Sequence, residues 1–262
     1  MLNLIRAEWT KLRHNWVLGI MLLILCLMAL GLSNATFGML PERLTAETPQ
    51  FFTGVEMTRG EHVFHRVMKD SSFTAWLSII FAALFIGVDF INRSMNQYIF
   101  SGHSRLKIFT VKIIECYIFA CLTSAIYPII SCLRYSLPWF ITLSIDDYIY
   151  ILRCIGLRAL LDMSLMTISI ITTFALRDFI RPIIGTLIAT LVLVQLFSIH
   201  YSLDPNSVFY KVLTFYPSFQ YSEVMARNIT PTQLITAVLS ASSFILLTII
   251  TSYLLFRKAE LS

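Results

Sequence analysis

The sequence predicts an all-α protein that is embedded in a membrane through six transmembrane helices. Of its 262 residues, 57% are hydrophobic and only 13% are charged, whereas soluble domains carry about 25% charged residues. Windows of the roughly 20 apolar residues that a helix needs to cross a bilayer recur along the chain, with short polar breaks between them. We therefore expect residues 1–262 to form a single transmembrane domain.

An amphipathic segment at about residues 3–14 precedes the first apolar window. Leucine and tryptophan alternate there with charged side chains, a pattern typical of a helix that lies in the membrane interface. The candidate interfacial residues are Glu8, Trp9, Lys11 and Arg13. A basic start before an apolar run also occurs in signal peptides, but the small-residue cleavage pattern is poor and further spans follow, so we expect an uncleaved first span.

The six predicted spans each have a length close to that needed to cross a bilayer. They cover about residues 16–32, 73–90, 108–133, 151–176, 182–197 and 233–256. Pro182, which follows a tight charged turn, suits the first turn of the fifth span.

Three longer polar segments, residues 33–72, 134–150 and 198–232, are expected on one side of the membrane. The first is too long for a bare turn and should hold one or two short surface helices. The second resembles an interfacial loop because Pro138, Trp139 and Tyr148 lie in it. The third is dense in aromatic residues and predicts an interfacial or partly re-entrant element.

Orientation follows from the distribution of basic residues, which concentrate in short cytoplasmic loops of membrane proteins. One set of segments is short and rich in base, whereas the other is longer and diluted by acidic residues. The basic set comprises Arg6, Lys11, Arg13, Arg93, Arg105, Lys107, Lys112, Arg177, Arg181, Arg257 and Lys258. The sequence therefore predicts a multi-pass protein of the cytoplasmic membrane with both termini in the cytoplasm.

The sequence lacks the usual catalytic motifs. It has no GxxxxGK[ST] phosphate-binding loop and no HExxH zinc motif; the stretch from Glu61 to His65 has the wrong order for the latter. Its five cysteines form no CxxC pair, so we interpret them as small core residues. The basic residues flank apolar spans instead of forming a stripe with stacking aromatics, which argues against nucleic acid as a partner. We expect no catalytic residue, no bound metal and no cofactor on this chain.

Some ionisable residues fall inside the predicted spans, where they are costly and often mark functional sites. Arg158 and Asp162 have the i, i+4 spacing of a pair on one helix face; a structural pair is favoured over a substrate contact. Lys112 and Glu115 are expected to extend toward the interface, and Asp89 to cap or dock a helix. Serine and threonine residues in the fourth and sixth spans fit either helix packing or a polar pathway.

The segment FINRSMNQYIFSGHSRLKIFTVK, residues 90–112, separates two very apolar spans although it is basic and polar. Together with the amphipathic N-terminus and the six-span layout, it resembles the permeases of ABC type-2 exporters. The resemblance covers the whole chain and is most specific over residues 85–115. Ser94-Met95-Asn96 stands where many relatives have a Gly-Thr-Ile-type step.

The resemblance implies that this segment holds a cytosolic coupling helix, which docks into a groove of a separately encoded ABC ATPase. Helix-in-groove recognition needs an apolar face, and Met95, Ile99 and Phe100 could provide it. The implied coupling residues are Arg93, Met95, Ile99, Phe100, Gly102, Arg105 and Lys107. An ordinary solvated loop with basic topology markers is the alternative for this segment.

The resemblance also implies a non-catalytic permease that pairs with a second copy of itself or a homologous permease in the lipid membrane, while ATP and Mg²⁺ bind the partner ATPase. Spans one, two and five would form the path. The cargo would be an amphipathic or hydrophobic peptide, lantibiotic or drug, as in antibiotic resistance or immunity, and polysaccharide export is another branch of the family. An intramembrane enzyme and a non-transporting anchor or sensor are the alternative functions.

The aromatic residues of the last outer segment suggest a further hypothesis. Phe209, Phe215, Tyr216 and Phe219 could form an apolar gate at the outer leaflet.

Overall fold

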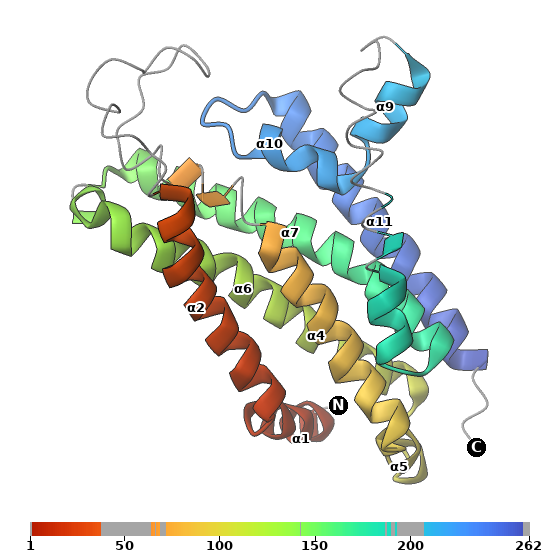
Figure 1. Cartoon of the computed structure of the whole chain (residues 1–262). Coiled ribbons are helices and arrows are strands. Elements are labelled where there is room, and N and C mark those ends of the chain that lie inside the picture. The colour runs from red at the N-terminus through yellow and green to blue at the C-terminus, as the bar shows by residue number, and fades with distance from the viewer. Residues whose placement is uncertain are drawn as a thin grey trace.

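A computed structural model describes residues 2–37, 64–65, 67–68, 72–141, 143–186, 188–189, 192 and 207–258. This part of the chain is helical and contains no β-strand (Figure 1). Its helices are α1 (Leu2–Arg13), α2 (Trp16–Phe37), α4 (Ser72–Ile91), α5 (Ser94–Phe100), α6 (Arg105–Ile141), α7 (Ile145–Leu176), α9 (Val208–Thr214), the 3₁₀ turn η1 (Pro217–Gln220), α10 (Tyr221–Val224) and α11 (Pro231–Lys258).

Within the described residues, four helices are long and apolar enough to cross a membrane, so the protein is membrane-embedded. They are Phe73–Ile91, Arg105–Leu133, Ile145–Leu176 and Pro231–Lys258. The predicted span at 16–32 corresponds to α2, of which Trp16–Leu30 forms a shorter apolar helix. Half of the predicted span at 182–197 lies outside the described residues, and 180–186 are helical.

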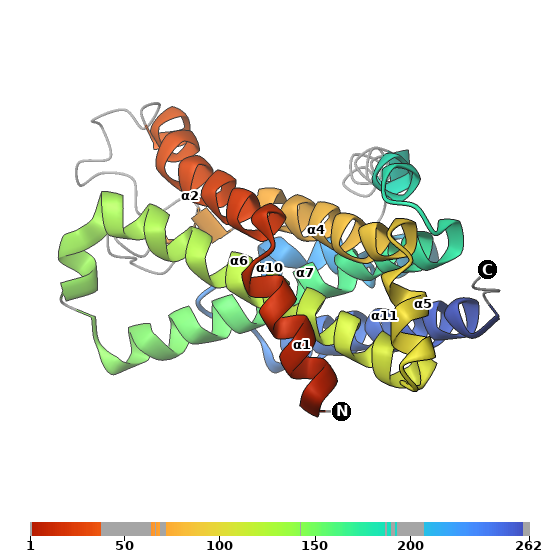
Figure 2. The same ribbon diagram turned by 90° about the horizontal axis from the view of Figure 1, so that it is seen from below.

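Both ends of the chain lie at the same end of the helical bundle (Figure 1). We call this the lower end; it holds α1, α5 and the last turn of α11. The opposite, upper end holds α9 and α10. Figure 2, viewed from below, shows α1 crossing under the bundle, where it contacts α6. Helix α7 packs against α4, α6 and α11.

The prediction of an interfacial loop at 134–150 is wrong. Helix α6 continues through Pro138 to Ile141, and α7 begins at Ile145. Ser144 caps α7: its hydroxyl accepts a hydrogen bond from the Asp147 amide at 3.3 Å, and the Asp147 carboxylate accepts one from the Ser144 amide at 3.0 Å. This reciprocal cap starts the helix early, and proline is tolerated within membrane helices. Proline and tryptophan therefore did not mark a loop here.

Aromatic side chains fill the lower half of the core. The ring of Phe81 stacks on that of Phe119 with centroids 3.9 Å apart, and on Phe85 at 5.2 Å. Phe174 of α7 meets Phe256 of α11 at 5.3 Å. These contacts link α4 to α6 and α7 to α11 below the middle of the bundle. The core is therefore tightly packed in its lower half.

At Gly87, helix α4 comes close to the turn that follows α7. A Cβ atom at this position would lie 2.6 Å from the carbonyl oxygen of Asp178 and 2.7 Å from the Cβ of Phe179. Backbone atoms cannot give way cheaply, so a side chain here would push the turn away from α4. Gly87 is therefore required for close packing.

We expect Gly87→Ala to lower the free energy of unfolding by about 1–3 kcal/mol, the usual cost of overpacking. The measurement is thermal unfolding of the purified protein in mild detergent. Gly156→Ala is the matched control, because nothing lies within 4 Å of its added Cβ; it should leave stability unchanged or raise it slightly. Equal stability of the two variants would contradict the close approach.

Candidate functional site

A cluster of buried charges lies at the lower end, where α1, α4 and α6 meet. We call Glu8, Lys11, Asp89, Lys112 and Glu115 the lower charge cluster. The ammonium group of Lys112, whose side chain is 1% exposed, pairs with the carboxylates of Glu8 and Asp89, the latter at 2.6 Å. Lys11 pairs with the other oxygen of Asp89. Ion pairs to two ammonium groups thus connect side chains of α1, α4 and α6.

This arrangement corrects the expectation that Lys112 and Glu115 extend to the interface. Both are buried, because α1 crosses this end of the bundle and brings Glu8 to Lys112. Of the two roles considered for Asp89, docking is the one observed, since it binds cations of α1 and α6. The sequence held no signal for the Glu8–Lys112 pair, whose members are separated by 104 positions.

Helix α5 lies beside this cluster and contains three of the seven predicted coupling residues. Met95 is only 1% exposed and belongs to the chain's own core, and Ile99 packs against the same core. Phe100 is 87% exposed. The expectation that all three residues offer one free apolar face is therefore wrong for Met95, because that side chain anchors α5 to the bundle.

The remaining predicted coupling residues bound α5 or begin α6. Arg93 and Gly102 both have positive φ, 55° and 84°, and close the two ends of α5. The guanidinium of Arg105 donates hydrogen bonds to the carbonyls of Phe256 at 3.3 Å and Arg257 at 2.7 Å. Arg105 therefore binds the C-terminal turn of α11, while Lys107 is exposed.

Tyr98 of α5 faces the lower charge cluster. Burial raises the pKa of Tyr98 above its ordinary value. The hydrogen bond to Glu8 and the negative charges of Glu8, Asp89 and Glu115 raise this pKa further. Its phenol is therefore neutral at physiological pH. In α1, Trp9 and Arg13 are exposed, and the position of this helix in the membrane interface stays a prediction.

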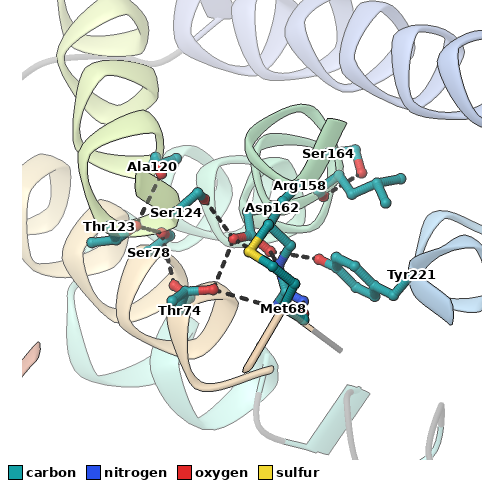
Figure 3. Close-up of polar contacts among 11 residues, drawn as sticks. Met68, Thr74, Ser78, Ala120, Thr123, Ser124, Arg158, Asp162, Ser164 and Tyr221 are labelled. Atoms are coloured by element: carbon teal, nitrogen blue, oxygen red, sulfur yellow. Dashed lines mark hydrogen bonds and ion pairs between the residues drawn. The ribbon is translucent and has the colours of Figure 1, made fainter. Parts of the chain in front are cut away.

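A second buried polar network joins α4, α6, α7 and α10 (Figure 3). We call Thr74, Ser124, Arg158, Asp162 and Tyr221 the upper polar network. The Asp162 carboxylate accepts hydrogen bonds from the hydroxyls of Thr74 at 2.9 Å, Ser124 at 2.7 Å and Tyr221 at 2.6 Å. It also accepts one from Arg158 Nε at 3.1 Å. Four elements thus bind one carboxylate.

The guanidinium group of Arg158 also has several partners. It donates to the Met68 carbonyl at 2.8 Å and to the Thr74 hydroxyl at 3.2 Å, and it lies 4.0 Å from the centre of the Tyr221 ring. The i, i+4 pair predicted from the sequence is confirmed, and its extension supports the structural interpretation. Burial and the Asp162 charge raise the pKa of Tyr221 well above its ordinary value, so its hydroxyl stays protonated as a donor.

Two of the four residues of the hypothetical gate are in ring contact. Tyr216 and Phe219 pack with ring centroids 6.2 Å apart, and Tyr216 meets Phe244 of α11 at 5.3 Å. Phe209 and Phe215 are exposed. Burial raises the pKa of Tyr216 to about 12. The gate itself stays a prediction.

The described part of the chain holds no set of three or more His, Cys, Asp or Glu side chains arranged to bind a metal ion. His65 contacts the Met225 carbonyl through Nδ1 at 2.9 Å, whereas His62 lies outside the described residues. The five cysteines are free thiols. The main chemical feature of the described residues is buried charge.

Comparison with known proteins yields no relative: no protein-family model matches the chain, and no curated protein matches it significantly.

Replacing Arg158 with Met would leave the Asp162 carboxylate buried without its counter-charge. We expect the free energy of unfolding to fall by about 3–5 kcal/mol, whereas the double variant Arg158→Met, Asp162→Leu should recover part of that loss. Thermal unfolding in detergent measures both.

The exposed pair of Arg181 with Asp178, separated by 3.6 Å, provides the control for this experiment. Arg181→Gln should cost about 1 kcal/mol or less. A double variant less stable than Arg158→Met would contradict the view that the unpaired charge dominates the loss.

Proposed function

We propose that this chain is the membrane-spanning permease subunit of an ABC exporter. It moves an amphipathic or hydrophobic cargo, such as a peptide, lantibiotic or drug, across the cytoplasmic membrane with ATP hydrolysed by a separate chain. The observation that carries the proposal is α5: a short helix between two membrane helices, anchored through buried Met95 and presenting Phe100 with 87% of its surface exposed.

The form of α5 fits docking into another protein. A large exposed aromatic ring at the end of a short, anchored helix is what a groove on a partner recognises. Because Met95 packs in the core and α5 is closed by positive-φ residues at both ends, the ring is carried on a rigid support. A push on Phe100 would therefore reach α4 and α6 directly.

The distribution of basic side chains supports placing the lower end in the cytoplasm. At that end Arg93 precedes α5, Lys107 lies in the first turn of α6, and Arg177 follows the last residue of α7, in agreement with the positive-inside rule. ATP and the partner ATPase are on the cytoplasmic side, so α5 and both chain ends would face it. A second copy of this chain, or a homologous permease, completes the proposed transporter.

The cargo proposal rests on the resemblance of residues 90–112 to exporters of this class and on the modest length of the chain. Such exporters serve resistance or immunity against antimicrobial compounds, and we propose that role here. The outer element α9–η1–α10 is the corresponding candidate for cargo release, because it lies at the upper end of the bundle (Figure 1).

Orientation is tested by cysteine labelling in a background with the five native cysteines replaced. Val208→Cys, at an exposed site of the upper end, should react with a membrane-impermeant maleimide in intact cells. Gln97→Cys, exposed on α5, should react only after lysis. The reverse pattern would place the lower end outside and exclude the proposed ATPase contact.

The coupling role is tested by Phe100→Asp, which puts a charge into the proposed contact. Loss of an interface anchor costs on the order of 2 kcal/mol or more, so ATPase recovery should fall by a factor of roughly 30. The measurement is co-purification of a P-loop ATPase with the tagged chain from membranes in mild detergent.

Lys107→Gln is the control, because an exposed charge at the rim contributes about 1 kcal/mol or less. Both variants must insert to the level of the unchanged protein. If Phe100→Asp recovers as much ATPase as the control, the α5 segment only fixes the topology and does not contact the ATPase. Hydrolytic activity of the purified chain without any co-purified ATPase would favour an intramembrane enzyme.

A further inference from the structure

The lower charge cluster contains one carboxylate more than it has cations. Glu8 and Asp89 are balanced by Lys11 and Lys112, to which they are paired. Glu115 is the additional acid, and only 4% of its surface is exposed. With Glu115 ionised the cluster carries a net negative charge inside the bundle; with Glu115 neutral it carries none.

Among the described residues, neither carboxylate oxygen of Glu115 has a hydrogen-bond partner. The ammonium of Lys112 lies 3.8 Å away, which is too long for a hydrogen bond. An ionised carboxylate removed from water needs donors or a counter-charge, and otherwise it takes up a proton instead. Lys112 provides little further compensation because two other carboxylates already share it.

The groups that face Glu115 come from four helices. They are Glu8 and Lys11 of α1, Asp89 of α4, Tyr98 of α5 and Lys112 of α6. The two other acids disfavour its negative charge, and Tyr98 adds no charge. The two lysines favour the ionised form, but each is already paired with Glu8 or Asp89. Burial and the two acids therefore favour the protonated carboxyl.

We propose that Glu115 is a proton-binding site of the bundle. In the arrangement described here it holds a proton, which it releases to solution when α1 or α5 withdraws and admits water to the cluster. The site depends on the contact of these two helices with the bundle, and it stands independently of the proposed transport function. A proton suffices as the ligand, because it makes the cluster neutral without further coordinating groups.

Dicyclohexylcarbodiimide tests the proposal, since it reacts with protonated carboxyl groups in apolar surroundings. The acid adds across the carbodiimide, its proton moves to nitrogen, and the adduct rearranges to a stable N-acylurea without a leaving group. The full chain in native membranes should be labelled at Glu115, as mapped by mass spectrometry, and Glu8 and Asp89 should remain unlabelled. Labelling should fall about tenfold for each pH unit once most of the carboxyl has ionised.

Glu115→Gln should abolish the label. Labelling of Glu8 or Asp89 in place of Glu115, or an unlabelled chain, would overturn the proposal. Protection by sodium ions at constant pH would assign the site to a metal cation and would overturn it as well.

Stability provides a second measurement that does not depend on access of the reagent. A glutamine side chain reproduces the shape and neutrality of a protonated glutamate, so Glu115→Gln should melt at the same temperature as the unchanged protein in detergent. Asp89→Asn, which removes a paired carboxylate, should melt several degrees lower. If both variants lose stability equally, Glu115 is ionised and the proposal fails.

Discussion

The lower end of the structure depends on the burial of the Lys112 ammonium group. A lysine removed from water requires counter-charges, and Glu8 of α1 and Asp89 of α4 supply them. Helix α1 is therefore tied to α4 and α6 by ion pairs that cannot be broken cheaply. Tyr98 brings α5 against the same group of charges. A movement of α5 would consequently be felt by α1, and the reverse also holds.

The two buried polar groups of the bundle differ in how completely they are satisfied. In the upper polar network each charged side chain has several partners, and Asp162 alone accepts hydrogen bonds from four residues. Such a network rigidifies the helices that it joins. The lower charge cluster leaves Glu115 without a hydrogen bond. We associate the upper polar network with stabilising the fold and the lower charge cluster with a change of protonation.

The stacked rings of Phe81, Phe85 and Phe119 lie on the same two helices, α4 and α6, that contribute to both polar groups. They fill the interval between Thr74 and Asp89 along α4 and between Lys112 and Ser124 along α6. This aromatic layer keeps the two polar groups apart in the low-dielectric interior, where charges act strongly on one another. The separation allows one group to alter its charge while the other retains its contacts.

The sequence by itself determined the features that depend on local composition: a membrane-embedded, all-helical chain, an amphipathic helix before the first apolar window, and the pairing of Arg158 with Asp162, because i, i+4 neighbours share a helix face. It places the end of α6 too early, because Pro138 indicates a loop whereas the helix continues through it to Ile141. Only the tertiary structure decided that Glu8 meets Lys112, that Met95 is buried while Phe100 is exposed, and that Glu115 lacks a donor. These facts depend on how α1 and α5 cross the bundle, and such contacts between distant segments leave no periodic pattern in one sequence.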